Sequence, residues 1–151
     1  MGIDLLLASL HHLVVFLLVA ILAAEFTLLR PGLSGGRIAQ LARIDAAYGA
    51  VATLVIIVGT FRVIFGASGW EYYVGNHAFW AKMAAFVAMG LLTIQPTLAI
   101  RRWAKALQGD SGYAIPASEL ASCRRYLHLQ AGILVLIPIL AAAMALGYGV
   151  G

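Results

Sequence analysis

The chain has 151 residues, of which 63% are hydrophobic and 11% are charged, and its mean hydropathy is +0.96. Soluble globular domains carry roughly 45–50% apolar and roughly 25% charged residues, so this composition excludes that class and predicts an integral membrane protein. The net charge of +4 does not indicate nucleic-acid binding, because most of the basic residues lie beside two predicted loops.

Four apolar stretches are long enough to cross a bilayer, since about 20 helical residues span the hydrocarbon. They cover residues 3–29, 46–65, 78–100 and 126–147, and together they use nearly all of the chain. The prediction is an all-α fold with one four-helix transmembrane domain over residues 1–151. The first stretch follows no basic segment and has no small-residue cleavage site, so we expect it to stay in the mature protein.

The basic residues predict the topology. Eight of the ten flank the first and third loops, whereas Arg62 and Lys82 lie on the opposite side. The positive-inside rule therefore places both termini outside, in the periplasm, and the two basic loops in the cytoplasm. We expect a multi-pass protein of the bacterial inner membrane. The eight loop residues are Arg30, Arg37, Arg43, Arg101, Arg102, Lys105, Arg124 and Arg125.

Three later spans each have a face that helical spacing predicts to point inward. Small residues dominate two of these faces and would allow close helix packing in lipid. A kink at Pro96 is tolerable if Thr93 or a neighbouring helix satisfies the freed carbonyl. The faces are Asp45, Gly49, Ala52, Ile56 and Gly59; Lys82, Phe86, Met89, Thr93 and Pro96; and His128, Gly132, Val135, Ile139 and Ala142.

The outer loop from Gly66 to Asn76 combines glycine turns with aromatic residues, which favour the headgroup level. It is predicted to be an interfacial lid.

The first span carries His11, His12 and Glu25. His11 and Glu25 are fourteen residues apart, which returns them to nearly the same helical face at a separation of about 21 Å. His12 points about 100° away. The register therefore predicts that His11, rather than His12, faces the bundle with Glu25.

An outer polar layer is predicted from His11, His12, Arg62 and Lys82. Imidazoles and cations without a buried carboxylate suit haem iron better than a hard divalent metal. The hypothesis is a b-type haem ligated by His11 or His12, with Lys82, Met89 or water opposite and with Arg62 or Lys82 near the propionates. Alternatively, the histidines hydrogen-bond between helices while Arg62 and Lys82 extend to the headgroups.

An inner polar layer is predicted from Glu25, Asp45 and His128. Such groups inside a membrane can relay protons or bind a cation. The alternative is structural pairing, with Asp45 near Arg43, His128 near the arginines that precede it, and Glu25 paired with His128.

Several segments together resemble an uncharacterised bacterial family of four-helix membrane proteins, named only as a domain of unknown function of the DUF 2214 type. They are LHHLVVF, AEFTLLRPGLSG, RIDAAYG, GTFRVIFG, YYVGNHAFWAKMAAFVAMGLLTIQPT and RRW. The resemblance covers nearly the whole chain. It implies a fold and no activity.

A more distant resemblance is to HemJ-type protoporphyrinogen oxidases, which also have a histidine in the first helix and a lysine early in the third. Those proteins bind haem b and oxidise protoporphyrinogen IX. The resemblance implies an axial-ligand role for His11 or His12 and a catalytic role for Lys82.

The leading functional hypothesis is a haem b protein of the inner membrane that transfers electrons or oxidises a porphyrin, with a porphyrin or quinone as partner; as an enzyme it would be an oxidoreductase. One alternative is a non-enzymatic subunit of a larger membrane complex whose polar layers hold helices together. The other is a small proton or cation conductor that uses Glu25, Asp45 and His128. Four short helices enclose little core, so a homodimer is also compatible with the sequence.

Overall fold

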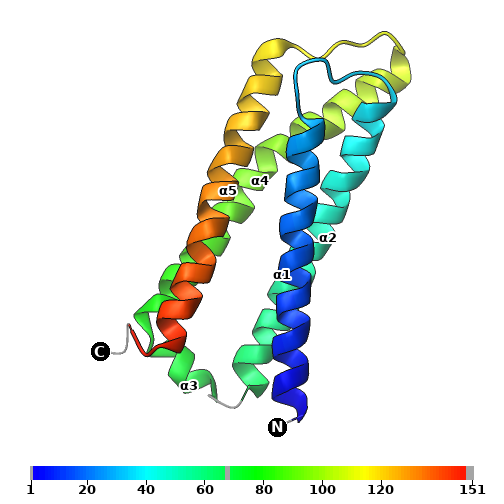
Figure 1. Cartoon of the computed structure of the whole chain (residues 1–151). Helices are drawn as coiled ribbons and strands as arrows, with labels where there is room; N and C mark the ends of the chain where they lie inside the picture. The colour runs from blue at the N-terminus through cyan, green and yellow to red at the C-terminus, as the bar shows by residue number, and fades with distance from the viewer. Residues whose placement is uncertain (1, 67–68, 149–151) are drawn as a thin grey trace.

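The computed structural model describes residues 2–66 and 69–148, and in these ranges the regular structure is helical, with no strand. Four long helices form an elongated bundle, and one short helix joins the second to the fourth (Figure 1). Each long helix is long and apolar enough to cross a membrane. The helices are α1 (Gly2–Leu28), α2 (Gly36–Phe65), α3 (Gly69–Val74), α4 (His77–Gly109) and α5 (Ala117–Ala145).

The bundle consists of two helical hairpins. Helix α1 packs along α2, helix α4 packs along α5, and the hairpins meet mainly where α2 contacts α4. Both chain termini and α3 lie at one end of the bundle, and the α1–α2 and α4–α5 loops lie at the other (Figure 1). We call these the terminal end and the loop end. That both termini lie at one end agrees with the predicted spans; the side of the membrane on which they lie stays a prediction.

The helices are longer than the predicted spans. Helix α2 begins at Gly36 rather than near residue 46, and α5 begins at Ala117 rather than near residue 126. Both additional segments are continuous with the spans, because nothing between them interrupts the helix. The α1–α2 connection does interrupt it: Pro31 lacks a backbone N–H, and Gly32 and Gly35 adopt φ values of 92° and 60°.

The predicted lid contains helix α3, and residues 67 and 68 of this segment lie outside the described ranges. The Tyr72 hydroxyl donates a hydrogen bond to the Met144 carbonyl at 2.9 Å, which ties α3 to the end of α5. Asn76 is fully buried, and its side chain caps α4 by accepting from the backbone N–H groups of Ala78 and Phe79 at 2.9 and 3.3 Å. The segment therefore closes the terminal end of the bundle.

One of the three predicted inward faces is wrong, and a second is right only in part. On α5, Gly132 and Val135 are exposed. On α2, Asp45 is buried and Ala52 packs against the core, but Gly49 and Ile56 are exposed. The interface between the two hairpins is formed by larger branched and polar side chains, so the helices do not approach each other through small residues. The third face is confirmed for Met89 and Pro96, which are buried. The buried residues are Ile38, Leu41, Asp45, Tyr48, Val51, Val55 and Val58 on α2, and Leu120, Cys123, Leu127, Gln130 and Ile137 on α5.

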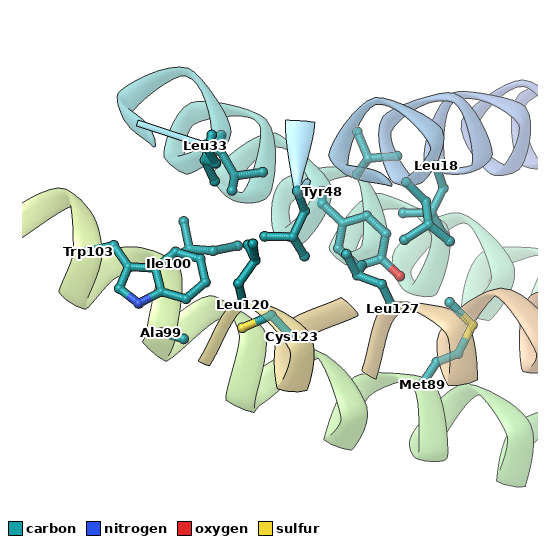
Figure 2. Packing of buried hydrophobic residues seen from close by; sticks show 14 of the residues in the cluster. Leu18, Leu33, Tyr48, Met89, Ala99, Ile100, Trp103, Leu120, Cys123 and Leu127 are labelled. Carbon is teal, nitrogen blue, oxygen red and sulfur yellow. The ribbon is translucent and has the colours of Figure 1, made fainter. Parts of the chain in front are cut away.

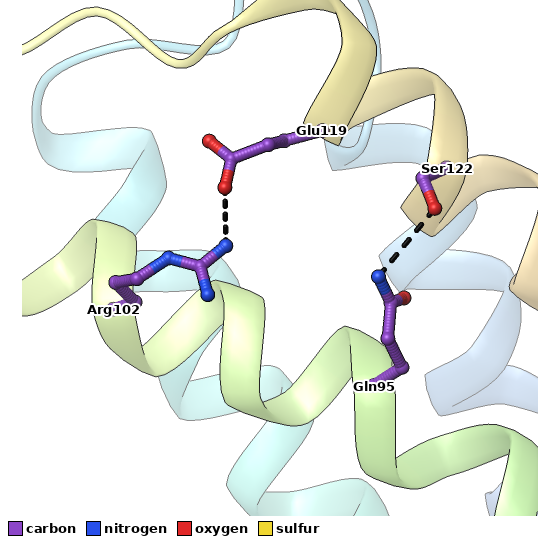
Figure 3. Close-up of polar contacts among 4 residues, drawn as sticks. All are labelled: Gln95, Arg102, Glu119 and Ser122. Carbon is purple, nitrogen blue, oxygen red and sulfur yellow. Dashed lines mark hydrogen bonds and ion pairs between the residues drawn. The ribbon is translucent and has the colours of Figure 1, made fainter.

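The most densely buried part of the core lies toward the loop end (Figure 2). Trp103 and Ile100 of α4 pack there with Leu120 and Cys123 of α5, and Trp103 has no exposed surface. Side-chain contacts between α4 and α5 extend this packing outward. Arg102 pairs with Glu119, and Gln95 Nε2 donates to Ser122 Oγ at 3.4 Å (Figure 3).

The proline inside α4 is accommodated by the neighbouring helix. Pro96 has no N–H to donate to the Leu92 carbonyl one turn earlier. Gln130 of α5 donates from Nε2 to that carbonyl at 3.2 Å. The expectation that a neighbouring helix satisfies the freed carbonyl is confirmed.

Candidate ligand cavity and buried carboxyl pair

A cavity of about 520 Å³ lies inside the terminal end of the bundle. Residues of α1, α2 and α4 form most of its walls, while Tyr73 of α3 and Met144 of α5 close it from the side of the chain ends. Its size lies within the roughly 300–1,000 Å³ of typical small-molecule and cofactor sites. Apart from three basic side chains, the walls are mostly apolar: Val55, Ile56, Val63, Ile64, Phe79, Met83, Phe86 and Val87.

The three basic side chains of the cavity come from three helices. His11 of α1, Arg62 of α2 and Lys82 of α4 all line it. Within residues 2–66 and 69–148, neither Arg62 nor Lys82 forms an ion pair or a side-chain hydrogen bond. Unpaired cations inside a membrane protein are costly. The cavity therefore has an electrostatic preference for an anionic group.

His11 lies where α1 and α2 come close together. A Cβ atom on Gly59 of α2 would lie 3.5 Å from Cε1 and 3.8 Å from Nδ1 of the His11 ring. The Nδ1 atom is buried and has no hydrogen-bond partner in the described structure. Buried polar atoms are rarely left unsatisfied. The ring is thus held in place by packing, and its Nδ1 atom is left without a protein partner.

Part of the apolar wall of the cavity also reaches the outer surface of the bundle. Ile56, Ile64 and Val87 line it and are also 60%, 53% and 63% exposed. These apolar side chains belong to helices that are long enough to cross a membrane. This side of the cavity therefore suits a ligand that reaches the site from within a bilayer.

Two other residues predicted as possible haem ligands lie outside this cavity. His12 is exposed, and its Nδ1 atom lies 2.7 Å from the Ala8 carbonyl of its own helix. Met89 is buried in the core but is not part of the lining, where Met83 lies instead. The prediction that His11 faces the bundle and His12 does not is confirmed. Within the described residues, no three His, Cys, Asp or Glu side chains come together as a metal-binding group.

The structure brings together two of the three residues of the predicted inner layer. Glu25 and Asp45 are 2% and 6% exposed, and their carboxyl groups lie against each other between α1 and α2. His128 does not join them: it is exposed, its Nδ1 contacts the Arg124 carbonyl of its own helix at 2.7 Å, and its ring packs edge-on against Phe26. The expectation that His128 points inward is wrong, because α5 turns Leu127 and Gln130 toward the core instead.

The role of Gln130 was not predicted, and Gly59 was predicted only as one small residue of the inward face of α2. Gln130 links three helices: its Oε1 accepts from Tyr48 at 3.1 Å and from Thr93 at 3.3 Å, and its Nε2 donates to Leu92. The sequence offered one signal for Gln130, which is an amide side chain in the middle of an apolar span. Gly59 gave no comparable signal, because its importance comes from the position of His11 on another helix.

Four long apolar helices with a cavity between them define a multi-pass helical membrane protein. The chain belongs to the family described as "Predicted membrane protein (DUF2214)", whose family model matches residues 3–149. That description assigns the membrane and no activity. The searches of curated proteins and of solved structures found no match.

Proposed function

We propose that this protein binds haem b in the cavity at its terminal end and takes part in membrane electron transfer. The observation that carries the proposal is that His11, Arg62 and Lys82 line one otherwise apolar cavity. Haem has a flat apolar body, an iron that accepts an imidazole nitrogen, and two anionic propionates. Each of these features has a counterpart among the residues of the cavity.

The residues of the cavity would divide these roles. His11 would be the axial ligand, because its ring lines the cavity and is held in place beside Gly59. Arg62 and Lys82 would bind the propionates. Phe79 and Phe86 would pack against the apolar body. Bound haem would supply one-electron redox chemistry, and the chain would control its affinity and its access through the apolar side of the cavity.

The direct test is the absorption spectrum of the full chain purified in mild detergent and titrated with haemin. We expect a saturable Soret band at one haem per chain in the wild type. His11→Ala should abolish it, whereas His12→Ala, the matched control on the next residue, should retain it. The proposal fails if the wild type shows no saturable band or if the two variants behave alike.

A second experiment tests the role of the cations. Arg62→Gln and Lys82→Gln should each weaken haemin binding roughly tenfold, since a hydrogen bond to a charged group contributes about 1.5–3 kcal/mol. Haemin dimethyl ester, which has no carboxylates, should bind all of these proteins with similar affinity. Arg102→Gln, which removes an exposed cation at the loop end, is the control. Equal losses with the ester would contradict a propionate contact.

Oxidation of a porphyrin is a second candidate function, because Lys82 lies in the same cavity as His11. The resemblance to HemJ-type enzymes implies important roles for residues at these two positions. The purified haem-loaded protein, supplied with protoporphyrinogen IX under anaerobic conditions and with a quinone as electron acceptor, should form protoporphyrin at a rate that Lys82→Gln lowers. Haem binding without this reaction would limit the function to electron transfer.

A further inference from the structure

A second polar site lies nearer the loop end, away from the cavity. Glu25 of α1 and Asp45 of α2 are almost completely buried and adjacent. The Oε1 atom of Glu25 has no hydrogen-bond partner in the described structure. Along α1, Glu25 and His11 are separated by about 21 Å of helix at 1.5 Å per residue. The carboxyl pair is therefore distinct from the haem site proposed above.

The surroundings of the pair supply little positive charge. Thr97 of α4 donates a hydrogen bond from Oγ1 to Asp45 Oδ1 at 3.2 Å. The other titratable groups that face the pair are Tyr48 on α2, Arg101 on α4 and Cys123 on α5. Arg101 is exposed and forms no ion pair with Asp45 within the described residues.

Two ionised carboxylates in contact repel each other, and burial away from water adds a desolvation cost for each charge. A single proton removes the repulsion and the desolvation cost of one of the two charges, and the protonated carboxyl can donate a hydrogen bond to its ionised neighbour. No cation in the described structure pairs with either carboxyl group. A shared proton is the simplest occupant that satisfies the unpartnered oxygen.

Further polar side chains continue from the pair toward the cavity. The Tyr48 side chain lies near Glu25 and donates to Gln130, which also accepts from Thr93. Thr93 in turn donates to the Met89 carbonyl at 2.8 Å, and Gly90, the next residue, lines the cavity. Three helices thus contribute to a polar column between the two sites.

We propose that Glu25 and Asp45 form a proton-binding site that holds one shared proton at neutral pH. Binding converts two carboxylates and one proton into a hydrogen-bonded acid–carboxylate pair, with no other atom exchanged. Thr97 orients Asp45, and Tyr48, Gln130 and Thr93 form the polar column that connects the pair with the floor of the cavity. This site does not depend on a bound haem.

Infrared spectroscopy of the full chain in lipid nanodiscs, without added haem, tests the site. At pH 7 the wild type should show the carbonyl stretch of a protonated carboxylic acid, shifted down in D₂O. Glu25→Gln and Asp45→Asn should each remove this band, because the introduced amide donates to the remaining carboxylate in place of the protonated carboxyl. Glu71→Gln, which alters an exposed carboxylate of α3, should leave the band unchanged.

A third variant keeps the test decisive if the pair variants fold poorly. Thr97→Val removes only the hydroxyl that donates to Asp45, so it should shift the frequency of the band without removing it. The proposal is overturned if the wild type lacks the band at pH 7, if the band survives in Glu25→Gln or Asp45→Asn, or if Thr97→Val leaves its frequency unchanged.

Discussion

The two ends of the bundle are built from the same four helices, but they differ in how tightly the interior is packed and in the charge of the side chains there. At the loop end, Trp103 and Leu41 are fully buried, and the acidic groups lie together in the packed interior. At the terminal end, the same hairpins enclose a cavity of about 520 Å³ with three basic groups in its walls. Helix packing alone explains the burial of Trp103 and Leu41, whereas the acidic pair requires the shared proton proposed above. The terminal end leaves basic groups without partners, which is typical of a binding site.

The largest expected effect tests the packed end. Trp103→Ala should lower the free energy of unfolding by about 3 kcal/mol. This value is at the low end for the truncation of a buried aromatic residue, because the hydrophobic effect contributes less to helix packing in lipid. Phe86→Ala, in the wall of the cavity, should lower it by only about 1 kcal/mol, because the side chain already borders open space. Unfolding in mixed micelles with increasing SDS measures both. Equal losses would contradict the difference between the two ends.

The next effect concerns the space beside His11. Gly59→Val would place methyl groups against the His11 ring, since even a Cβ there lies 3.5 Å from Cε1. Crowding of this kind typically costs about 1–3 kcal/mol, so haemin affinity should fall roughly tenfold. Gly49→Val, on the same helix with no atom within 4 Å of its Cβ position, is the control. Equal haemin affinities of the two variants would exclude the proposed contact.

A smaller effect is expected in the polar column. Gln130→Leu removes contacts with Tyr48, Thr93 and the Leu92 carbonyl. At roughly 0.6 kcal/mol for each hydrogen bond between membrane helices, the loss should be about 1–2 kcal/mol. Gln95→Leu, which removes one contact with Ser122 (Figure 3), should cost less in the same SDS unfolding assay. A greater loss for Gln95→Leu would contradict the central role of Gln130.

The smallest effect is expected at the ion pair of Arg102 and Glu119, whose side chains are 60% and 30% exposed (Figure 3). Solvent screens such pairs, so Arg102→Gln should change the free energy of unfolding by less than about 1 kcal/mol, and added salt should reduce the difference. A larger loss that salt does not reduce would show that this pair contributes to the core of the loop end.

The sequence predicted the number of long helices and the orientation of His11, because a fourteen-residue spacing returns to nearly the same face of one helix. It placed Glu25 and Asp45 in the same polar layer, but it did not predict that their carboxyl groups lie against each other. That contact depends on the rotation of α2 about its axis, which helical spacing within one segment does not determine. The same limit applies to the orientation of His128. Helices α1 and α5 have few contacts, so no local sequence pattern determines how α5 is rotated relative to α1.

The haem site proposed at the terminal end of the bundle depends on His11. Crystals of the full chain grown with haemin, measured at the iron absorption edge, test this proposal directly because anomalous scattering locates the iron. We expect one iron inside the cavity, within bonding distance of a ring nitrogen of His11, with the propionates near Arg62 and Lys82. An iron beside His12 on the exposed face of α1, or no ordered iron at saturating haemin, would contradict it.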